Sequence, residues 1–284
     1  MAEQRTFKTT GEQGLDFDSL PMQLWDKDKK FGIWNPADID FSEDRRHWES
    51  FDEDQKEVLL HLSSLFIGGE EAVTVDLLPL IQVIAEEGRL EEEMFLTSFL
   101  WEEAKHVEAF RRFFDEVADE FSDLSRFHGP NYKRLFEEEL PQALQTLRED
   151  ASPVAQARAS VTYNMIVEGV LAETGYHAYF DMLERHELMP GMREVVGKLK
   201  QDESRHLAFG VHLLSRLVRD HGQPVWEAID ARMNELFPIA LGIVDEIFEP
   251  YDPVPFELDK DQFVGFATTQ FQKRYQRVAR SLEE

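Results

Sequence analysis

The hexapeptides WEEAKH, residues 101–106, and QDESRH, residues 201–206, decide the fold expected for this chain. Each contains a Glu-x-x-His tetrad, and no other tetrad of this kind occurs in the 284 residues. Residues three apart project from one face of an α-helix, so the Glu and the His of each tetrad can face the same binding site. One such tetrad is ordinary on a helix surface, whereas two call for a common explanation.

Upstream of each tetrad, at a matching distance, an acidic residue stands in an apolar run. Before the first tetrad the run is FIGGEEAVTV, in which periodicity leaves Glu70 and Glu71 as alternatives. Before the second it is YNMIVEGVLAE, in which the alternatives are Glu168 and Glu173. Two antiparallel helix pairs would each deliver two carboxylates and one imidazole. The sequence therefore predicts a buried dinuclear metal site, to which the tetrads contribute Glu103, His106, Glu203 and His206.

The ligand types limit the metals that suit this site. Four carboxylates carry four negative charges, which two divalent cations would neutralise, so the cluster could lie in an apolar interior. The chain has no cysteine, which excludes an iron–sulfur cluster and a thiolate zinc site. Oxygen and imidazole ligands suit iron and manganese.

The remaining sequence predicts an all-α fold. From about residue 51 onward helical spacing dominates, and glycines and prolines mark the breaks. A helix start is also indicated at residues 40–44, where a short polar side chain leads an acidic turn. We expect a helical bundle that forms a single domain over residues 1–284, with residues 1–50 as an irregular segment packed on it. The predicted helices are 52–87, 89–119, 132–149, 153–187, 190–220, 224–247 and 259–282.

Composition excludes several classes of partner. The chain has 57 acidic and 30 basic residues, a formal net charge of −27, which disfavours nucleic acid and anionic membranes. The first residues, MAEQRTFKTTGEQG, lack the apolar core of a signal peptide. No uncharged apolar stretch of 18 residues occurs, so we expect no membrane-spanning segment and a cytoplasmic location.

At these motifs the chain resembles the ferritin-like carboxylate di-metal proteins, and among them the small subunit of ribonucleotide reductase. It is more similar still to the R2-like ligand-binding oxidases. The similarity runs from RTFKTTGEQGL through GGEEAVT, WEEAKH, TYNMIVEG and QDESRH to the last helix. The resemblance implies a ferritin-like bundle with a manganese site and an iron site. The implied manganese ligands are Glu70, Glu103 and His106, and the implied iron ligands are Glu168, Glu203 and His206.

The resemblance also implies roles for residues around the metals. Asp202 would orient His106 with help from Trp34, which agrees with the general need of a ligand imidazole for an outer partner. Tyr176 is a further residue that the resemblance implies near the cluster.

A valine and a tyrosine distinguish the oxidases from the reductase subunits, and both residues are present in this chain. In the oxidases a matching pair, here Val73 and Tyr163, is joined by an ether cross-link after oxygen activation. Val73 lies one turn after Glu70 and shares its face. Tyr163 lies about 140° around an ideal helix from Glu168, so a π-type distortion is expected to bring both to one cluster.

The resemblance implies an enzyme, a metal-dependent oxidoreductase that uses O₂ and a Mn/Fe cofactor. Ligand types alone do not separate Mn/Fe from Fe/Fe, and affinity alone favours iron over manganese. The oxidases bind a long-chain fatty acid whose carboxylate meets the metals, and runs such as LLPLIQVIA and LFPIALGIV offer material for an apolar channel. A homodimer is also implied. The external substrate is not specified by the sequence.

Three other functions compete with the oxidase. The first is a ribonucleotide reductase small subunit. By resemblance, Phe110 occupies the position at which many such subunits carry their radical tyrosine. Some reductase subunits also have phenylalanine there, so this residue alone does not exclude them. The sequence after Tyr275 reads as helix rather than as a docking tail, which favours the oxidase. An acyl-carrier-protein desaturase would need a basic patch for its acidic partner, which the net charge disfavours. An iron-storage bundle has no need of Val73 and Tyr163 together.

Overall fold

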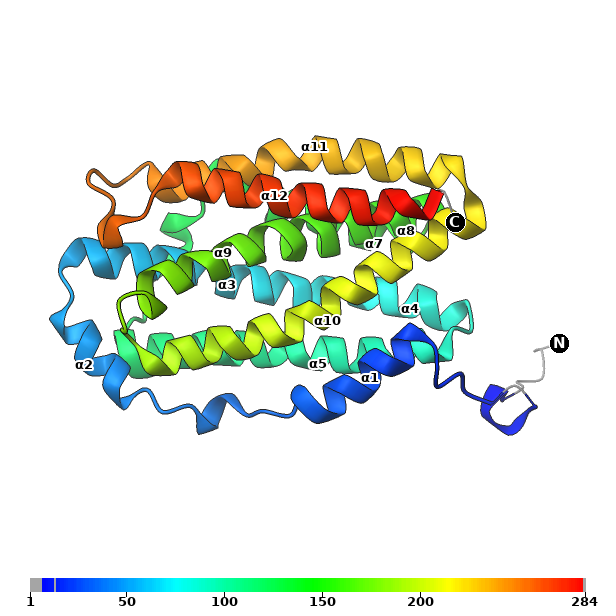
Figure 1. Ribbon diagram of the computed structural model, residues 1–284, viewed down its shortest axis with the longest axis horizontal. Helices are drawn as coiled ribbons and strands as arrows, with labels where there is room; N and C mark the ends of the chain where they lie inside the picture. Colours follow the sequence, from blue (N-terminus) through cyan, green and yellow to red (C-terminus); the bar gives the residue numbers. More distant parts are fainter. Residues whose placement is uncertain (1–6, 13, 283–284) are drawn as a thin grey trace.

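Long helices that run back and forth make up the protein in this computed structural model, which describes residues 7–12 and 14–282 (Figure 1). Arg5, Thr6 and Gln13 of the RTFKTTGEQGL motif lie outside the described residues. No strand occurs among the described residues, which confirms the all-α prediction. The α-helices are α1 Leu20–Phe31, α2 Ser42–Ser50, α3 Glu53–Asp76, α4 Leu78–Glu86, α5 Leu90–Phe113, α6 Pro130–Lys133, α7 Leu140–Thr146, α8 Pro153–Ser160, α9 Glu173–Tyr179, α10 Pro190–His221, α11 Gln223–Phe248 and α12 Lys260–Ala279.

Four π-helical segments interrupt or extend these helices. They lie at Phe114–Ala118, Arg134–Glu139, Val161–Ala172 and Phe180–Glu184. The seven predicted helical segments are all helical, but five are composite: 89–119 ends in the π-helix Phe114–Ala118, and 259–282 ends in the 3-10 turn Arg280–Leu282. The segment 52–87 divides at Leu77 into α3 and α4, and the segments 132–149 and 153–187 alternate between α and π geometry.

The prediction of an irregular N-terminal segment is wrong for two stretches, because α1 and α2 are regular helices. Pro21 lies in the first turn of α1, where a missing backbone N–H costs nothing. α1 buries Met22 and Leu24 against the bundle. The helix start expected at residues 40–44 is confirmed, since α2 begins at Ser42.

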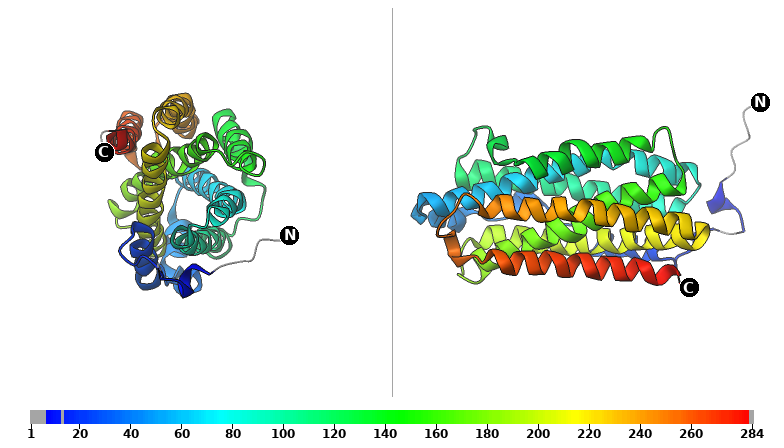
Figure 2. Two further views of the ribbon diagram at one scale, coloured as in Figure 1. Left: turned by 90° about the vertical axis from the view of Figure 1, so that its right-hand side faces the viewer. Right: turned by 90° about the horizontal axis from the view of Figure 1, so that it is seen from above.

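The bundle is built around four segments that contact one another: α3, α5, α10 and the π-helix Val161–Ala172. α1 lies along α5 and α10, and α11 and α12 pack on the π-helix and on each other. Figure 2 shows the arrangement end-on and from above, with α11 and α12 on the outside of the bundle. The buried apolar residues form two clusters; Val73 and Tyr163 belong to the first, and Phe66 and Tyr176 to the second.

One helical stretch, Glu53–Glu86, is long and apolar enough by length and composition to cross a membrane. Within the bundle, 61% of its most apolar window is buried by other parts of the protein. Core helices of bundles share this property, because they are apolar on several faces. The stretch also carries Glu70, whose buried surroundings are described next.

Candidate metal centre

Six side chains from the four central segments converge on one buried place. α3 supplies one, the π-helix Val161–Ala172 supplies one, and α5 and α10 supply two each. Their ligand atoms form two groups, in each of which all atoms lie within 4.8 Å of one another. Glu103 and Glu203 belong to both groups, so these two carboxylates could contribute to both metal positions. The first group also holds Glu70 and His106, and the second holds Glu168 and His206.

The inner atoms of this cluster lack hydrogen-bond partners, which is unusual for buried polar groups. Five such atoms without a partner are Glu103 Oε2, His106 Nδ1, Glu168 Oε1, Glu203 Oε2 and His206 Nδ1. His106 Nδ1 lies 3.4 Å from Glu70 Oε2 and 3.4 Å from Glu203 Oε1. These atoms are the donor set that a pair of cations requires, so the residues present fit a dinuclear metal site.

Electrostatics favour the same conclusion. Burial raises the pKa of Glu70 to about 8 and also raises the pKa of Glu168 and Glu203, whose carboxylates repel one another. Burial opposes charging of His106 and His206, but the surrounding carboxylates outweigh it and raise both pKa values. The cluster therefore retains protons when no cation is bound, and two divalent cations would replace them.

The structure decides between the alternatives that periodicity left open. Glu70 is buried in the cluster, whereas its neighbour Glu71 is exposed to solvent. Glu168 lies in the cluster, whereas Glu173 lies 3.9 Å from an arginine of α12 and faces a different groove. The ligand set brought together by the fold is thus the one that the family resemblance implied.

The predicted π-type distortion is confirmed, because residues Val161–Ala172 are π-helical. In a π-turn the backbone bonds join residues five apart, so residues at this spacing come to share a face. Tyr163 and Glu168 are five apart, and both reach the cluster. The Tyr163 hydroxyl donates a hydrogen bond of 2.9 Å to Glu103 Oε1. Burial and the nearby carboxylates raise the pKa of Tyr163 well above its ordinary value, which keeps the hydroxyl protonated.

Each imidazole has an outer carboxylate partner, and the two partners are exchanged between the tetrads. His106 Nε2 lies 3.3 Å from Asp202 Oδ2, which also accepts a hydrogen bond of 2.8 Å from Trp34 Nε1. His206 Nε2 lies 2.9 Å from Glu102 Oε2. A proton held on each Nε2 leaves Nδ1 with its lone pair toward the cluster, as metal ligation needs.

The contact between Asp202 and His106 was implied by the resemblance, but sequence reasoning missed Glu102. A signal was nevertheless present, since Glu102 precedes its tetrad as Asp202 precedes the other. By that symmetry Glu102 is the expected partner of the second imidazole.

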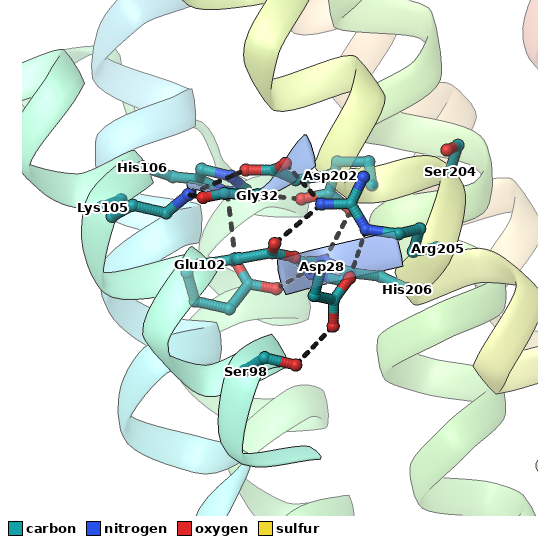
Figure 3. Close-up of polar contacts among 12 residues, drawn as sticks. Asp28, Gly32, Ser98, Glu102, Lys105, His106, Asp202, Ser204, Arg205 and His206 are labelled. Atoms are coloured by element: carbon teal, nitrogen blue, oxygen red, sulfur yellow. Dashed lines mark hydrogen bonds and ion pairs between the residues drawn. The ribbon is translucent and has the colours of Figure 1, made fainter. Parts of the chain in front are cut away.

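A single guanidinium joins both outer carboxylates (Figure 3). Arg205 Nη2 donates hydrogen bonds of 2.7 Å to Glu102 Oε1 and 2.6 Å to Asp202 Oδ1, and its Nε donates to Asp28 of α1. Ser98 also donates to Asp28. Lys105 occupies the equivalent place in the first tetrad and contacts Asp202 at 3.2 Å. Sequence reasoning missed these cations, although a basic residue precedes the histidine in both tetrads.

The other predicted residues also lie near the cluster. Val73 is buried and lines a cavity together with Glu70. Tyr176 is buried, its hydroxyl has no hydrogen-bond partner, and its ring stacks on Phe66 at 5.3 Å. The carboxylates of the cluster contribute to a raised pKa for Tyr176, after the larger effect of burial. Phe110 is fully buried and also stacks on Phe66, at 5.1 Å.

An apolar cavity leads away from the cluster. Its volume is about 100 Å³, and its inner end is formed by carboxylates that belong to the cluster. The walls are apolar side chains of α3, the π-helix and the end of α11, with Phe66, Val167 and Phe248 among them. Such a passage suits an apolar ligand with one polar end, because only the inner end offers polar contacts.

Comparison with known proteins places this arrangement in a family. Residues 22–277 match the family model described as ribonucleotide reductase, small chain. The chain belongs to this family. Among solved structures, an R2-like ligand-binding oxidase with an aerobically reconstituted Mn/Fe cofactor is 38% identical to this chain. That match covers 97% of this chain and 98% of the other, with a TM-score of 0.92.

Solved structures of variants of such an oxidase are similar to this chain to the same degree. A tyrosine-to-phenylalanine variant with aerobically reconstituted Mn/Fe is 38% identical, covers 97% of this chain and 99% of its own, and has a TM-score of 0.93. A valine-to-alanine variant with anaerobically reconstituted Mn/Fe is 38% identical, covers 97% and 98%, and has a TM-score of 0.90. The likeness therefore extends over nearly the whole chain.

Proposed function

We propose that this protein is an oxygen-activating oxidase with a Mn/Fe pair in the six-residue cluster. It binds a long-chain fatty acid or a similar apolar carboxylate at the metals and forms an ether between Val73 and Tyr163. The observation that carries the proposal is the meeting of Tyr163 and Val73 at one buried cluster. The tyrosine hydroxyl contacts Glu103, and the valine lines the cavity next to Glu70.

The relatives support the assignment of this pair. Their solved structures include variants at one valine and two tyrosines, with the cofactor named as Mn/Fe. The valine and the tyrosines replaced there have the same separations along the chain as Val73, Tyr163 and Tyr176 here. Residues at those three places in this chain all lie at or beside the cluster.

One of the two protons released by the cross-link reaction has an acceptor among the residues of this chain. The ether joins the Tyr163 oxygen to a side-chain carbon of Val73, so one O–H and one C–H bond break while one C–O bond forms. Two electrons and two protons leave, and the Tyr163 proton has an acceptor in Glu103 Oε1 at 2.9 Å. When bound, the two metals would supply the oxidising equivalents of O₂ for this reaction. Burial of Val73 and Tyr163 excludes water from the place where the bond forms.

The cavity supports an apolar carboxylate as the ligand. A cavity of about 150 Å³ is enough for a benzene molecule, so one of about 100 Å³ holds only part of a long acyl chain. We therefore expect side chains at the outer end, such as Phe136, to shift when the ligand binds. The carboxylate would meet the metals, and the chain would lie along Phe66 and Val167.

The first experiment is peptide mapping after aerobic loading with Mn and Fe. The expected result is a cross-linked peptide that contains Val73 and Tyr163 and has lost two hydrogen atoms. Tyr163→Phe is expected to load metal without forming that peptide. A map without the cross-link, after verified loading and exposure to O₂, would refute the oxidase. Anomalous diffraction at the Mn and Fe edges tests the metal pair, and two irons at full occupancy would refute Mn/Fe.

A ribonucleotide reductase small chain is the second candidate, because the family model that matches carries that description. Phe110 lies 5.1 Å from Phe66 in an apolar stack and offers no phenol for a stored radical. Deoxyribonucleotide formation with a cognate large subunit would favour this candidate over the oxidase. We further propose a cytoplasmic homodimer, for which light scattering of the purified protein is the first test.

A further inference from the structure

Asn164 is a buried polar residue of the π-helix Val161–Ala172 to which the metal centre and the cross-link assign no part. It lies in the run YNMIVEGVLA, where the other residues between Tyr163 and Glu168 are apolar. Its side chain is 1% exposed. Asparagine has a low helix propensity, and a buried amide needs hydrogen bonds at both of its polar ends. A specific contact is therefore expected to favour this residue over an apolar one.

Two hydrogen bonds along the helix meet at Asn164, and each joins residues four apart, which are neighbours on a helix surface. Asn164 Nδ2 donates a hydrogen bond of 3.0 Å to Glu168 Oε2. Asn164 Oδ1 accepts a hydrogen bond of 2.9 Å from the hydroxyl of Ser160, which is also buried. Because the hydroxyl donates to the amide oxygen, the amide NH₂ group is turned toward the carboxylate.

The two oxygens of the Glu168 carboxylate therefore have different surroundings. Oε2 accepts the hydrogen bond from Asn164, whereas Oε1 has no hydrogen-bond partner and lies 3.8 Å from His206 Nδ1 within the cluster. The last torsion of a glutamate side chain is soft, so a carboxylate without a partner can turn and exchange its two oxygens. The hydrogen bond from Asn164 opposes this rotation and determines which oxygen faces the cluster.

α10 approaches Asn164 closely at a glycine. A Cβ atom on Gly210 would lie 2.4 Å from Asn164 Cβ and 2.7 Å from Asn164 Cγ, which is too short for a real contact. Gly210 lies in the interior of α10, four residues after His206, where glycine is less favourable to the helix than alanine. The absence of a side chain at Gly210 thus admits the amide, and the close packing restricts its rotamer.

Glu70 is the counterpart of Glu168, because each is the one carboxylate of its ligand group that lies outside the two tetrads. No side-chain amide or hydroxyl among residues 7–12 and 14–282 donates a hydrogen bond to the Glu70 carboxylate. Its Oε2 instead lies 3.4 Å from His106 Nδ1. The metal position beside Glu70, called the first position below, therefore lacks the neutral donor found at the second position, beside Glu168.

We propose that Asn164 is a positioning residue that holds Glu168 Oε1 toward the second metal position and so sets the affinity of that position separately from the first. The inference rests on the proposed function, since it concerns the metal pair of the same cluster. Outer partners that orient a ligand ordinarily contribute to metal affinity. Ser160 and Gly210 act through Asn164, because the hydroxyl orients the amide and the glycine makes room for it.

Anaerobic titration of the full-length, metal-free protein with Mn(II) tests this role. Anomalous diffraction at the Mn edge, on crystals equilibrated at several Mn(II) concentrations, measures the occupancy of each position. Asn164→Leu keeps the size of the side chain but removes both hydrogen bonds. We expect Mn(II) to bind about 10–100-fold more weakly at the second position, with little change at the first. In metal-free crystals of this variant, the Glu168 carboxylate should turn away from its present orientation.

Two further variants complete the experiment. The matched control is Asn234→Leu, since the Asn234 amide also donates to a carboxylate four residues away, Asp230 Oδ1 at 3.0 Å, but is exposed on α11. It should leave both metal positions unchanged. Ser160→Ala is a milder change that keeps the amide and removes only the hydroxyl that orients it. It should weaken the second position in the same direction by a smaller factor, and it decides the question if Asn164→Leu does not fold.

Three results would overturn the proposal. An equal loss of affinity at both positions in Asn164→Leu would mean that the residue supports folding rather than one metal position. The second result is a second position unchanged in Asn164→Leu, or in Ser160→Ala where only that variant folds. The third is a Glu168 carboxylate that keeps its orientation in Asn164→Leu. Each of these leaves the oxidase proposal standing, provided that the unsubstituted chain binds Mn(II) at both positions. An unsubstituted chain that binds no Mn(II) at the cluster would overturn both proposals.

Discussion

Replacing Arg205 by methionine should damage both halves of the candidate metal centre at once. The guanidinium is 5% exposed and contacts three buried carboxylates, on Asp28, Glu102 and Asp202. Methionine keeps most of the side-chain volume but removes the charge and every donor. Removal of one partner of a buried ion pair costs about 3–5 kcal/mol, because the remaining charge stays buried without compensation. We expect Arg205→Met to lower the free energy of unfolding by about that amount at pH 8.

The same substitution has a defined pH dependence. Burial already raises the pKa of Asp28 in the native protein, and loss of the nearby guanidinium, which lowers that pKa, should raise it further above the unfolded value. A group with a raised folded-state pKa contributes stability below its unfolded pKa and loses it as the pH rises. The deficit of Arg205→Met should therefore be smaller at pH 5 than at pH 8. Urea unfolding of the metal-free protein at both values measures this difference.

Metal affinity provides the second measurement for this variant. Loss of an outer partner of a metal ligand typically costs about 10–100-fold in affinity. Arg205 contacts the outer carboxylates of both imidazoles, so both metals should bind at least about tenfold more weakly in a competition with a chelator. Arg205→Lys should recover only part of the lost metal affinity, because one ammonium group does not span three carboxylates. The control is Arg112→Met, on the surface of α5, which should lower the free energy of unfolding by less than about 1 kcal/mol. Unchanged stability and unchanged affinities in Arg205→Met would refute the reasoning.

Three further predictions follow from buried residues elsewhere. Burial lowers the pKa of His61 to about 4, below the unfolded value of about 6.5, so the unfolded state binds more protons between these values. The free energy of unfolding should therefore rise by about 3 kcal/mol between these two pH values. In His61→Leu this dependence on pH should be weaker, as measured by urea unfolding at several pH values. Asp44 accepts hydrogen bonds of 2.8 and 2.7 Å from two backbone N–H groups in the first turn of α10, so Asp44→Ala should cost about 2–3 kcal/mol in thermal unfolding. Phe99 stacks on His206 at 3.6 Å and is fully buried; Phe99→Ala should cost about 3–5 kcal/mol in the same assay, whereas Phe180→Ala, at an exposed position, should cost little.

Sequence reasoning was most informative where all the residues of a predicted pair lie on one helix. The pair Glu103 and His106 is defined by a spacing of three within α5, and periodicity alone brings it to one face. The choice between Glu168 and Glu173 depends on how a π-helix turns, which spacing on an ideal helix does not reveal. The family resemblance supplied that choice, and the geometry of residues 161–172 gives its physical reason.

Contacts between distant segments were harder to predict. Asp28 reaches Arg205 across 177 residues, from a helix that the sequence analysis expected to be irregular. Once residues 20–31 are known to be helical, the spacing of Asp28 from Pro21 and Leu24 places it on the buried face of α1, but its partner Arg205 cannot be predicted from that spacing. Glu102 could have been predicted, because the five-residue pattern of acid, Glu, any residue, base and His occurs twice. That repeat was used only for its ligands and not for the acid and the base beside them.

The exchange of outer carboxylates has a consequence for how the two sites can diverge. Each tetrad supplies one imidazole and the outer carboxylate of the other imidazole, so a substitution in either helix affects both halves of the cluster. Selectivity for two different ions would then have to arise from what the repeat does not share. Two such differences lie against the imidazoles: Trp34 stacks on one at 6.3 Å, and Phe99 stacks on the other at 3.6 Å. Substitution of either aromatic residue would therefore act on one imidazole alone while leaving all six residues of the cluster in place.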